Sequence, residues 1–112
     1  MKETTVFVGQ KGVLVFAKSK DSSHDDWLVL ISNVTEKSDG LYVKGYIFYN
    51  LTTHVWYFDR RGESWGYTTH FEFYEPTREQ KQKISNELAR RGFKYVPVLN
   101  KLVKYGSYNF TI

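Results

Sequence analysis

The amino-acid sequence predicts a small α+β domain, in which an antiparallel β-barrel of the SH3-like type is followed by one α-helix and a β-hairpin. Three observations favour this class. The 112 residues suffice for a single domain, which we take as residues 1–112. Aromatic residues make up 18% of the chain, and such side chains fit strands better than helix interiors. After Pro76 the apolar pattern changes from a period of two to a helical period, which separates a barrel over 1–76 from a helix and hairpin over 77–112.

The first predicted elements are a hairpin, a loop and a central strand. Residues 6–17, VFVGQKGVLVFA, contain two apolar runs separated by Gly-Gln-Lys-Gly, which predicts a tight reversal between two strands. Residues 18–26 carry no apolar side chain and therefore predict an exposed loop. The run from Trp27 to Val34 is apolar on both faces up to Ile31, which is typical of a strand covered on each side.

The next segment, residues 41–48, alternates between an aliphatic face and an aromatic, basic face. The aliphatic face comprises Leu41, Val43, Gly45 and Ile47. The other face comprises Tyr42, Lys44, Tyr46 and Phe48. The alternation predicts a strand with one face toward the core.

A second hairpin follows, because residues 50–53, Asn-Leu-Thr-Thr, form a four-residue connection to the run HVWYF. A four-residue connection predicts that Tyr46 lies opposite Tyr57. In that register the core receives three side chains: Ile47, Trp56 and Phe58. Residues 59–66, DRRGESWG, predict a charged turn, and the alternation of residues 67–74 predicts a further strand.

The helix is predicted over residues 78–91. Thr77 and Gln80 match a capping box, and Gly92 supplies the left-handed stop. Its apolar stripe is narrow and contains Ile84 and Leu88. After it, the apolar residues between 93 and 105 predict a hairpin that turns through 97–100, and residues 108–112, YNFTI, predict a last strand.

Two segments carry a resemblance. The run KGVLVFAKSKDSSHDDW followed by LVLISNV contains a V-L-V strand, an acidic loop and a Trp. The ending EPTREQKQKISNELARRGFKYVPVLNKL contains a Pro-Thr-capped helix followed by an aromatic hairpin. In these motifs the chain resembles small uncharacterised proteins of phages and mobile elements of gut bacteria, whereas residues 41–70 depart from that pattern. The resemblance implies a phage or mobile-element origin and no known activity.

Catalytic and metal sites are not expected. The three histidines, at positions 24, 54 and 70, lack metal-binding spacings, and the pair expected to meet across neighbouring strands is His54 and His70. A lone histidine on a strand is more often packed than a ligand, so we assign no metal site. The sequence has no nucleophile elbow, no Gly-rich phosphate loop and no cysteine. We therefore expect a protein that is not an enzyme, with no catalytic residue and no cofactor.

The charge is uneven along the chain. Residues 77–104, here called the basic lobe, carry eight basic and two acidic side chains, whereas residues 1–76 have a net charge of −2. Such a lobe attracts a nucleic-acid backbone, and its candidate binding residues are Lys83, Arg90, Arg91, Lys94 and Lys101. The alternative is an ordinary solvated helix with ion pairs from Glu79 to Lys83 and from Glu87 to Arg91.

The aromatic face is the second candidate surface. Its predicted binding residues are Tyr42, Lys44, Tyr46, Phe48 and Tyr57. Four large rings exceed what a solvated face usually exposes, so either the C-terminal helix covers them or they form a groove for a ligand. An open aromatic face of this kind docks peptides or single-stranded nucleic acid.

These patterns predict a non-enzymatic binding module. Its expected ligand is a protein or peptide, or a nucleic-acid backbone bound through the basic lobe. The alternative is a structural or assembly protein of a phage or mobile element that associates through its sheet edges, so the chain is expected to be a monomer or weak homo-oligomer. Because the N-terminus lacks an apolar signal region and the chain lacks a long apolar run, we expect a cytoplasmic protein with no membrane partner.

Overall fold

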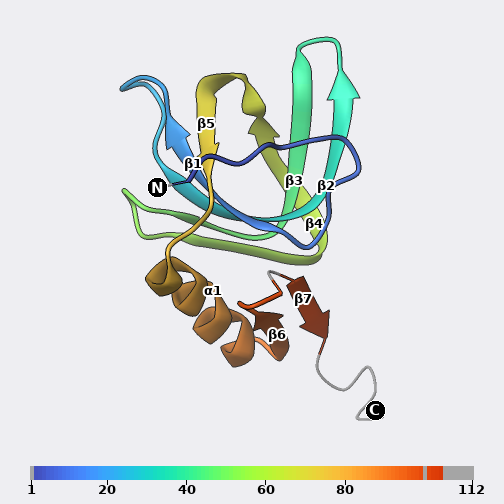
Figure 1. The fold of residues 1–112 in the computed structure, drawn as a ribbon, viewed down its shortest axis with the longest axis vertical. Helices are drawn as coiled ribbons and strands as arrows, with labels where there is room; N and C mark the ends of the chain where they lie inside the picture. The colour runs from blue at the N-terminus through green and yellow to red at the C-terminus, as the bar shows by residue number, and fades with distance from the viewer. Residues whose placement is uncertain (1, 100, 105–112) are drawn as a thin grey trace.

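The computed structural model describes residues 2–99 and 101–104. Its largest element is an antiparallel five-stranded sheet with the order β4-β3-β2-β1-β5 (Figure 1). Its strands are β1 (Leu14–Ser19), β2 (Trp27–Lys37), β3 (Gly40–Asn50), β4 (Trp56–Tyr67) and β5 (Phe71–Tyr74). A short 3₁₀ helix, η1 (Thr68–His70), connects β4 to β5. The predicted α+β class is confirmed.

The C-terminal part follows the prediction closely. Helix α1 (Arg78–Arg90) precedes a hairpin of β6 (Phe93–Val96) and β7 (Lys101–Lys104), and both lie together at one end of the molecule (Figure 1). The capping box is present, because the Gln80 N–H donates to Thr77 Oγ1 at 3.1 Å and the Thr77 N–H donates to Gln80 Oε1 at 2.9 Å. The predicted last strand, YNFTI, lies outside the described residues. In the described part of the chain no helix is long and apolar enough to cross a membrane.

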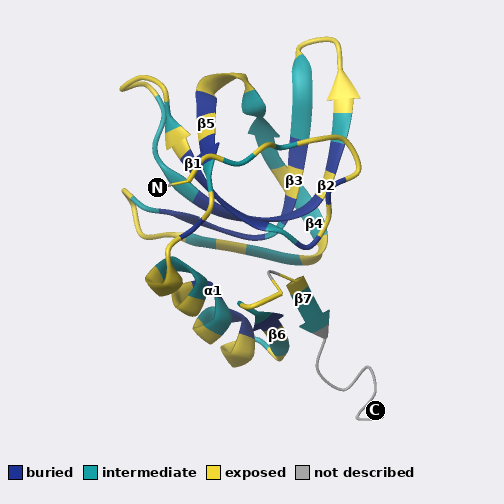
Figure 2. Cartoon of the chain, viewed as in Figure 1, coloured by how far each residue is buried: buried dark blue, intermediate teal, exposed yellow. Residues whose placement is uncertain are grey.

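Strand β2 separates two cores, as its apolar run predicts. Leu28 and Leu30 belong to the helix-side core, whose fully buried part also contains Ile84 and Leu88 of α1. Val29 and Ile31 point the other way, into what we call the inner core. Both faces of the strand are therefore buried (Figure 2). The inner core comprises Val15, Ala17, Val29, Ile31, Val34, Val43, Phe48, Phe71 and Phe73.

The inner core forms because the sheet curls. Trp65 near the end of β4 contacts the rings of Phe71 and Phe73 on β5, with ring centroids 4.7 and 6.2 Å apart, although β4 and β5 are the two edges of the sheet. Gly62 adopts φ +93° in the middle of β4, a conformation that favours glycine. The described strand pairings leave the sheet open between β4 and β5.

Two sequence predictions for the barrel are wrong. Residues 6–8 form no strand, because the residues around them hydrogen-bond to β5 and β2 and not to β1, the Thr4 N–H donating to the Phe73 carbonyl at 3.0 Å. The N-terminal segment instead meets β2, where the Gly9 N–H donates to the Val34 carbonyl at 2.9 Å. Residues 59–66 form no turn either, because β4 continues through them to Tyr67 and η1 follows.

The predicted register between β3 and β4 is also wrong. The pairing passes from Gly45–Glu63 to Ile47–Phe58 and omits Tyr46, which marks a β-bulge. Tyr57 therefore pairs with Phe48 and not with Tyr46. The predicted core-facing residues are nevertheless correct, because Ile47, Trp56 and Phe58 all contribute to the helix-side core.

Candidate functional site

The bulge at Tyr46 divides the predicted aromatic face between the two sides of the sheet. Tyr46 packs against the helix-side core, whereas Phe48 is only 4% exposed and belongs to the inner core. Tyr57 stacks on Phe48 at 5.3 Å between centroids and remains 40% exposed. Lys44 is exposed. The predicted residues therefore do not form one platform.

Tyr42 lies in a separate ring pair. Its ring meets Tyr67 edge-on at 5.0 Å, and the ammonium of Lys37 lies 4.3 Å above it. This arrangement follows from the cross-strand pairing of Tyr42 with Tyr67. It connects the β3 tyrosine to the end of β4, where another group of aromatic side chains gathers.

We call this group the aromatic pocket. It is a hollow of about 270 Å³ lined by His24, Trp27, Trp65, Gly66, Tyr67, His70 and Phe71. Its residues come from the β1–β2 loop, the start of β2, the end of β4, η1 and the start of β5. Curling of the sheet brings these segments together, so the pocket lies where the two edges approach each other.

The indole of Trp27 connects the pocket to part of the predicted aromatic face. Its ring centroid lies 5.9 Å from that of Phe48, 5.9 Å from that of Tyr57 and 6.3 Å from that of Trp65. Such tilted and edge-to-face contacts are favourable between aromatic rings. Phe48 and Tyr57 thus support the pocket from one side.

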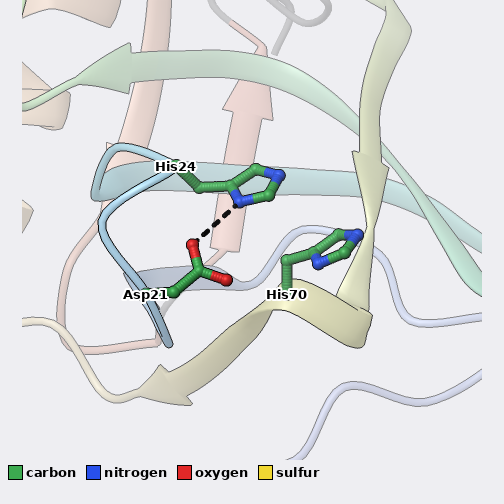
Figure 3. A group of neighbouring side chains, drawn as sticks. All are labelled: Asp21, His24 and His70. Carbon is green, nitrogen blue, oxygen red and sulfur yellow. Dashed lines mark hydrogen bonds and ion pairs between the residues drawn. The ribbon is translucent and has the colours of Figure 1, made fainter.

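Two imidazoles and a carboxylate form the rim. The rings of His24 and His70 are stacked with centroids 4.4 Å apart, and Asp21 Oδ1 lies 3.4 Å from His24 Nδ1 (Figure 3). Hydrogen bonds from the Ser23 hydroxyl, and then from the Ser23 backbone N–H, lower the pKa of Asp21 to about 2. The structure thus pairs His70 with His24, whereas His54 lies beside Tyr49, with Nδ1 2.7 Å from the hydroxyl.

The three predicted binding cations at the helix, Lys83, Arg90 and Arg91, contact aromatic rings or Glu87. The Lys83 ammonium lies 4.7 Å from the Tyr49 ring centroid. The Arg91 guanidinium lies 5.0 Å from that of Phe58. Both Arg90 and Arg91 donate to Glu87, at 2.6 and 2.8 Å, and these contacts lower the pKa of the Glu87 carboxyl, the hydrogen bond from Arg90 having the largest effect. The predicted pair of Glu87 and Arg91 is therefore present.

The remaining predicted cations lie on the terminal hairpin. Lys94 on β6 is exposed. Lys101 on β7 lines a hollow of about 220 Å³ together with Lys11 and Tyr46. The structure thus separates Lys101 from the helix cations and places it beside Lys11, a residue that the charge distribution along the sequence did not select.

Comparisons of this chain with protein families, curated proteins and solved structures find no match. The assignment of the candidate site therefore rests on its geometry alone. Sequence reasoning missed four of its ring residues: Trp27, Trp65, Tyr67 and Phe71. One signal was available, because aromatic residues are enriched in interfaces and Trp27 and Trp65 each border a polar segment of the chain.

Proposed function

We propose that this chain is a non-enzymatic binding module that holds an extended peptide in its aromatic pocket. One observation carries the proposal: large aromatic side chains from separate elements converge on a single hollow at the surface. Apolar pockets with a few polar groups at the rim are the usual form of a binding site. The side chains that perform this role are Trp27, Trp65, Tyr67 and Phe71, with Tyr57 extending the surface.

We further propose an SH3-like barrel as the type of fold. The strand order supports it, since consecutive strands β1 to β4 are neighbours and the last strand, β5, returns to pair with β1. The contacts of Trp65 with Phe71 and Phe73 bring the open edges of the sheet together. Folds of this type bind proline-rich peptides in aromatic-lined grooves, because the extended peptide loses little conformational entropy on binding.

The charge beside the pocket indicates which peptide fits. Residues 20–26 of the β1–β2 loop contain three aspartates and one lysine. A basic side chain on the ligand would gain from these carboxylates and from the faces of the tryptophans. The proposed ligand is therefore a proline-containing peptide with at least one arginine or lysine.

Isothermal titration with synthetic peptides tests the proposal. A peptide with a Pro-x-x-Pro core and flanking arginines should bind, and the same peptide with flanking glutamates should bind at least about tenfold more weakly. Trp65→Ala should abolish binding, whereas Phe7→Ala, which removes a ring 54% exposed outside the pocket, should not. No heat of binding at submillimolar peptide, or binding unchanged in Trp65→Ala, would refute the proposal.

A second candidate function is binding of a nucleic-acid backbone by the basic lobe. The specific observation is the hollow in which Lys11 and Lys101 lie beside Tyr46, since paired ammonium groups attract phosphate and a tyrosine ring can stack on a base. Fluorescence anisotropy with single-stranded and duplex oligonucleotides tests it. Lys11→Glu with Lys101→Glu should weaken binding and flatten its salt dependence more than Lys2→Glu with Lys20→Glu, an equal change of charge at other exposed positions.

Self-association through the edges β4 and β5 stays a prediction, as does the origin in a phage or mobile element. Sedimentation equilibrium at micromolar concentration separates the assembly role from the binding role. A monomeric mass would contradict assembly, whereas a dimer that dissociates when β4 is altered at an exposed edge position would favour it.

A further inference from the structure

The Asp21 carboxylate and the imidazoles of His24 and His70 form a compact cluster (Figure 3). One possible ligand atom from each residue lies within 4.8 Å of the other two. Asp21 and His24 belong to the β1–β2 loop, whereas His70 is the last residue of η1. Folding therefore brings together three metal-ligating side chains from two segments that are distant in the sequence.

We propose that Asp21, His24 and His70 bind a divalent transition-metal ion of the Zn²⁺ type. Two imidazole nitrogens and one carboxylate oxygen suit such ions, and three protein ligands leave one position for water or for a ligand group. In a tetrahedral zinc site neighbouring ligand atoms are about 3.3 Å apart, so the three side chains must approach one another by about 1.5 Å or less. Their position at the surface allows this movement, since the side chains of Asp21 and His24 are 54% and 36% exposed.

The loop holds Asp21 in place for this role. The Ser23 N–H and hydroxyl donate to Asp21 Oδ1 at 2.9 and 2.5 Å, which orients the carboxylate. The other two loop carboxylates have structural contacts, because Asp26 Oδ1 accepts from the Ser19 N–H at 2.8 Å and Asp25 Oδ2 accepts from the Asn50 amide at 3.0 Å. These bonds fix the loop at both ends, and such supporting contacts orient the ligands of metal sites.

Because of its position, an ion bound by the cluster would connect two elements of the fold. His24 and His70 both line the aromatic pocket, so a bound ion would connect the β1–β2 loop to η1 at its rim. The ion would add a cross-link to two segments that the stacked imidazoles and a backbone hydrogen bond from the Lys20 N–H to the His70 carbonyl, at 3.0 Å, already connect. The three ligating side chains are complete without the pocket's ligand, but the positive charge of a bound ion would oppose the basic side chain of the proposed peptide, so metal and peptide binding are coupled.

Calorimetric titration of the tag-free chain with ZnCl₂ tests the proposal. We expect one ion per chain and a rise in melting temperature with added zinc. Asp21→Asn, His24→Gln and His70→Gln should each weaken binding by at least about tenfold. The matched control is His54→Asn, which removes the third histidine while asparagine tolerates the φ of 62° at that position. Circular dichroism verifies that each variant is folded.

Histidine-resolved NMR of the unaltered chain provides a test that needs no variant. Added Zn²⁺ should shift the ring signals of two histidines, His24 and His70, and leave those of His54 in place. The proposal is overturned by an absence of zinc binding at about 100 µM, by shifts confined to His54, or by equal losses of affinity in His54→Asn and His70→Gln.

Discussion

On the side of α1 the sheet is covered by a separate helix, whereas on the opposite side it is covered by its own curled edges. The helix side receives Ile84, Leu88 and Tyr95, all essentially inaccessible to solvent. The inner core ends in Trp27 and Trp65, which pack against it but remain partly exposed. The first closure fully buries the side chains at the contact with the helix, and the second leaves a pocket lined by rings.

The difference teaches how a small sheet can keep an accessible pocket. A helix joined through a short connection can settle on the sheet until the gap is filled to normal packing density. A curled sheet has less freedom, because the backbone ladder of each strand limits how far the edges can approach. Large rings then span the remaining gap, and they stay partly accessible to a ligand.

The largest effect is expected on the helix side. Leu88→Ala should lower the free energy of unfolding by about 3 to 4 kcal/mol, because Leu88 is fully buried and truncation leaves a cavity between α1 and the sheet. Urea denaturation measures the change. Leu99→Ala serves as the control, since Leu99 is 61% exposed and its loss should cost under about 0.5 kcal/mol. Equal costs for the two variants would contradict the burial of Leu88 between the helix and the sheet.

A somewhat smaller effect is expected where β4 bends. A Cβ added at Gly62 would overlap with Ser32 Oγ and lie 2.8 Å from Ser32 Cβ, and the φ of +93° strains any other residue. Gly62→Ala should therefore cost about 3 kcal/mol in urea denaturation. Gly9→Ala separates the steric overlap from the strain of a positive φ, because Gly9 has φ +86° with nothing within 4 Å of an added Cβ. This variant should lower the free energy of unfolding by only about 1 kcal/mol. If both variants lost the same free energy of unfolding, close packing against Ser32 would not contribute to the cost of Gly62→Ala.

The sequence predicted elements whose signals are local. The capping box of Thr77 and Gln80, the stripe of Ile84 and Leu88, and the doubly apolar strand after Trp27 all agree with the structure. Each signal lies within a few residues of the feature that it specifies, and the contacts with the rest of the fold agree with it. The terminal hairpin was predicted for the same reason.

The sheet register and the continuation of β4 depend on pairing between strands, which the local sequence does not specify. The bulge at Tyr46 shifts the alternation of β3 by one residue, which moves Phe48 to the inner core. The charged run around Gly62 is typical of a turn, yet β3 offers it a pairing partner and the strand continues. The aromatic pocket depends on both features, since it forms only where β4 curls toward β5. For this reason its residues were the part of the site that the sequence did not predict.

The third prediction compares one tryptophan from each side of the sheet. Trp65→Ala and Trp56→Ala should each cost about 2 kcal/mol, less than for a fully buried ring, because both side chains are partly exposed. The two should differ in peptide binding, which only Trp65→Ala is expected to remove, since Trp56 packs against the helix-side core. Denaturation and peptide titration of the same preparations test this, and an equal loss of binding would place the ligand outside the aromatic pocket.

The smallest effect concerns Tyr95, whose pKa is raised by burial on the helix side. An unfolded tyrosine ionises near pH ~10, so above that pH the unfolded chain releases a proton that the folded chain retains, and stability falls as pH rises. Between about pH 9 and pH 11 the free energy of unfolding should therefore fall more steeply for the native chain than for Tyr95→Phe, which lacks the ionising hydroxyl, in urea denaturation. Leu99→Ala, which changes an exposed side chain that does not titrate, should keep the native slope. Parallel slopes for native protein and Tyr95→Phe would mean that Tyr95 ionises without unfolding and that the helix-side core admits water.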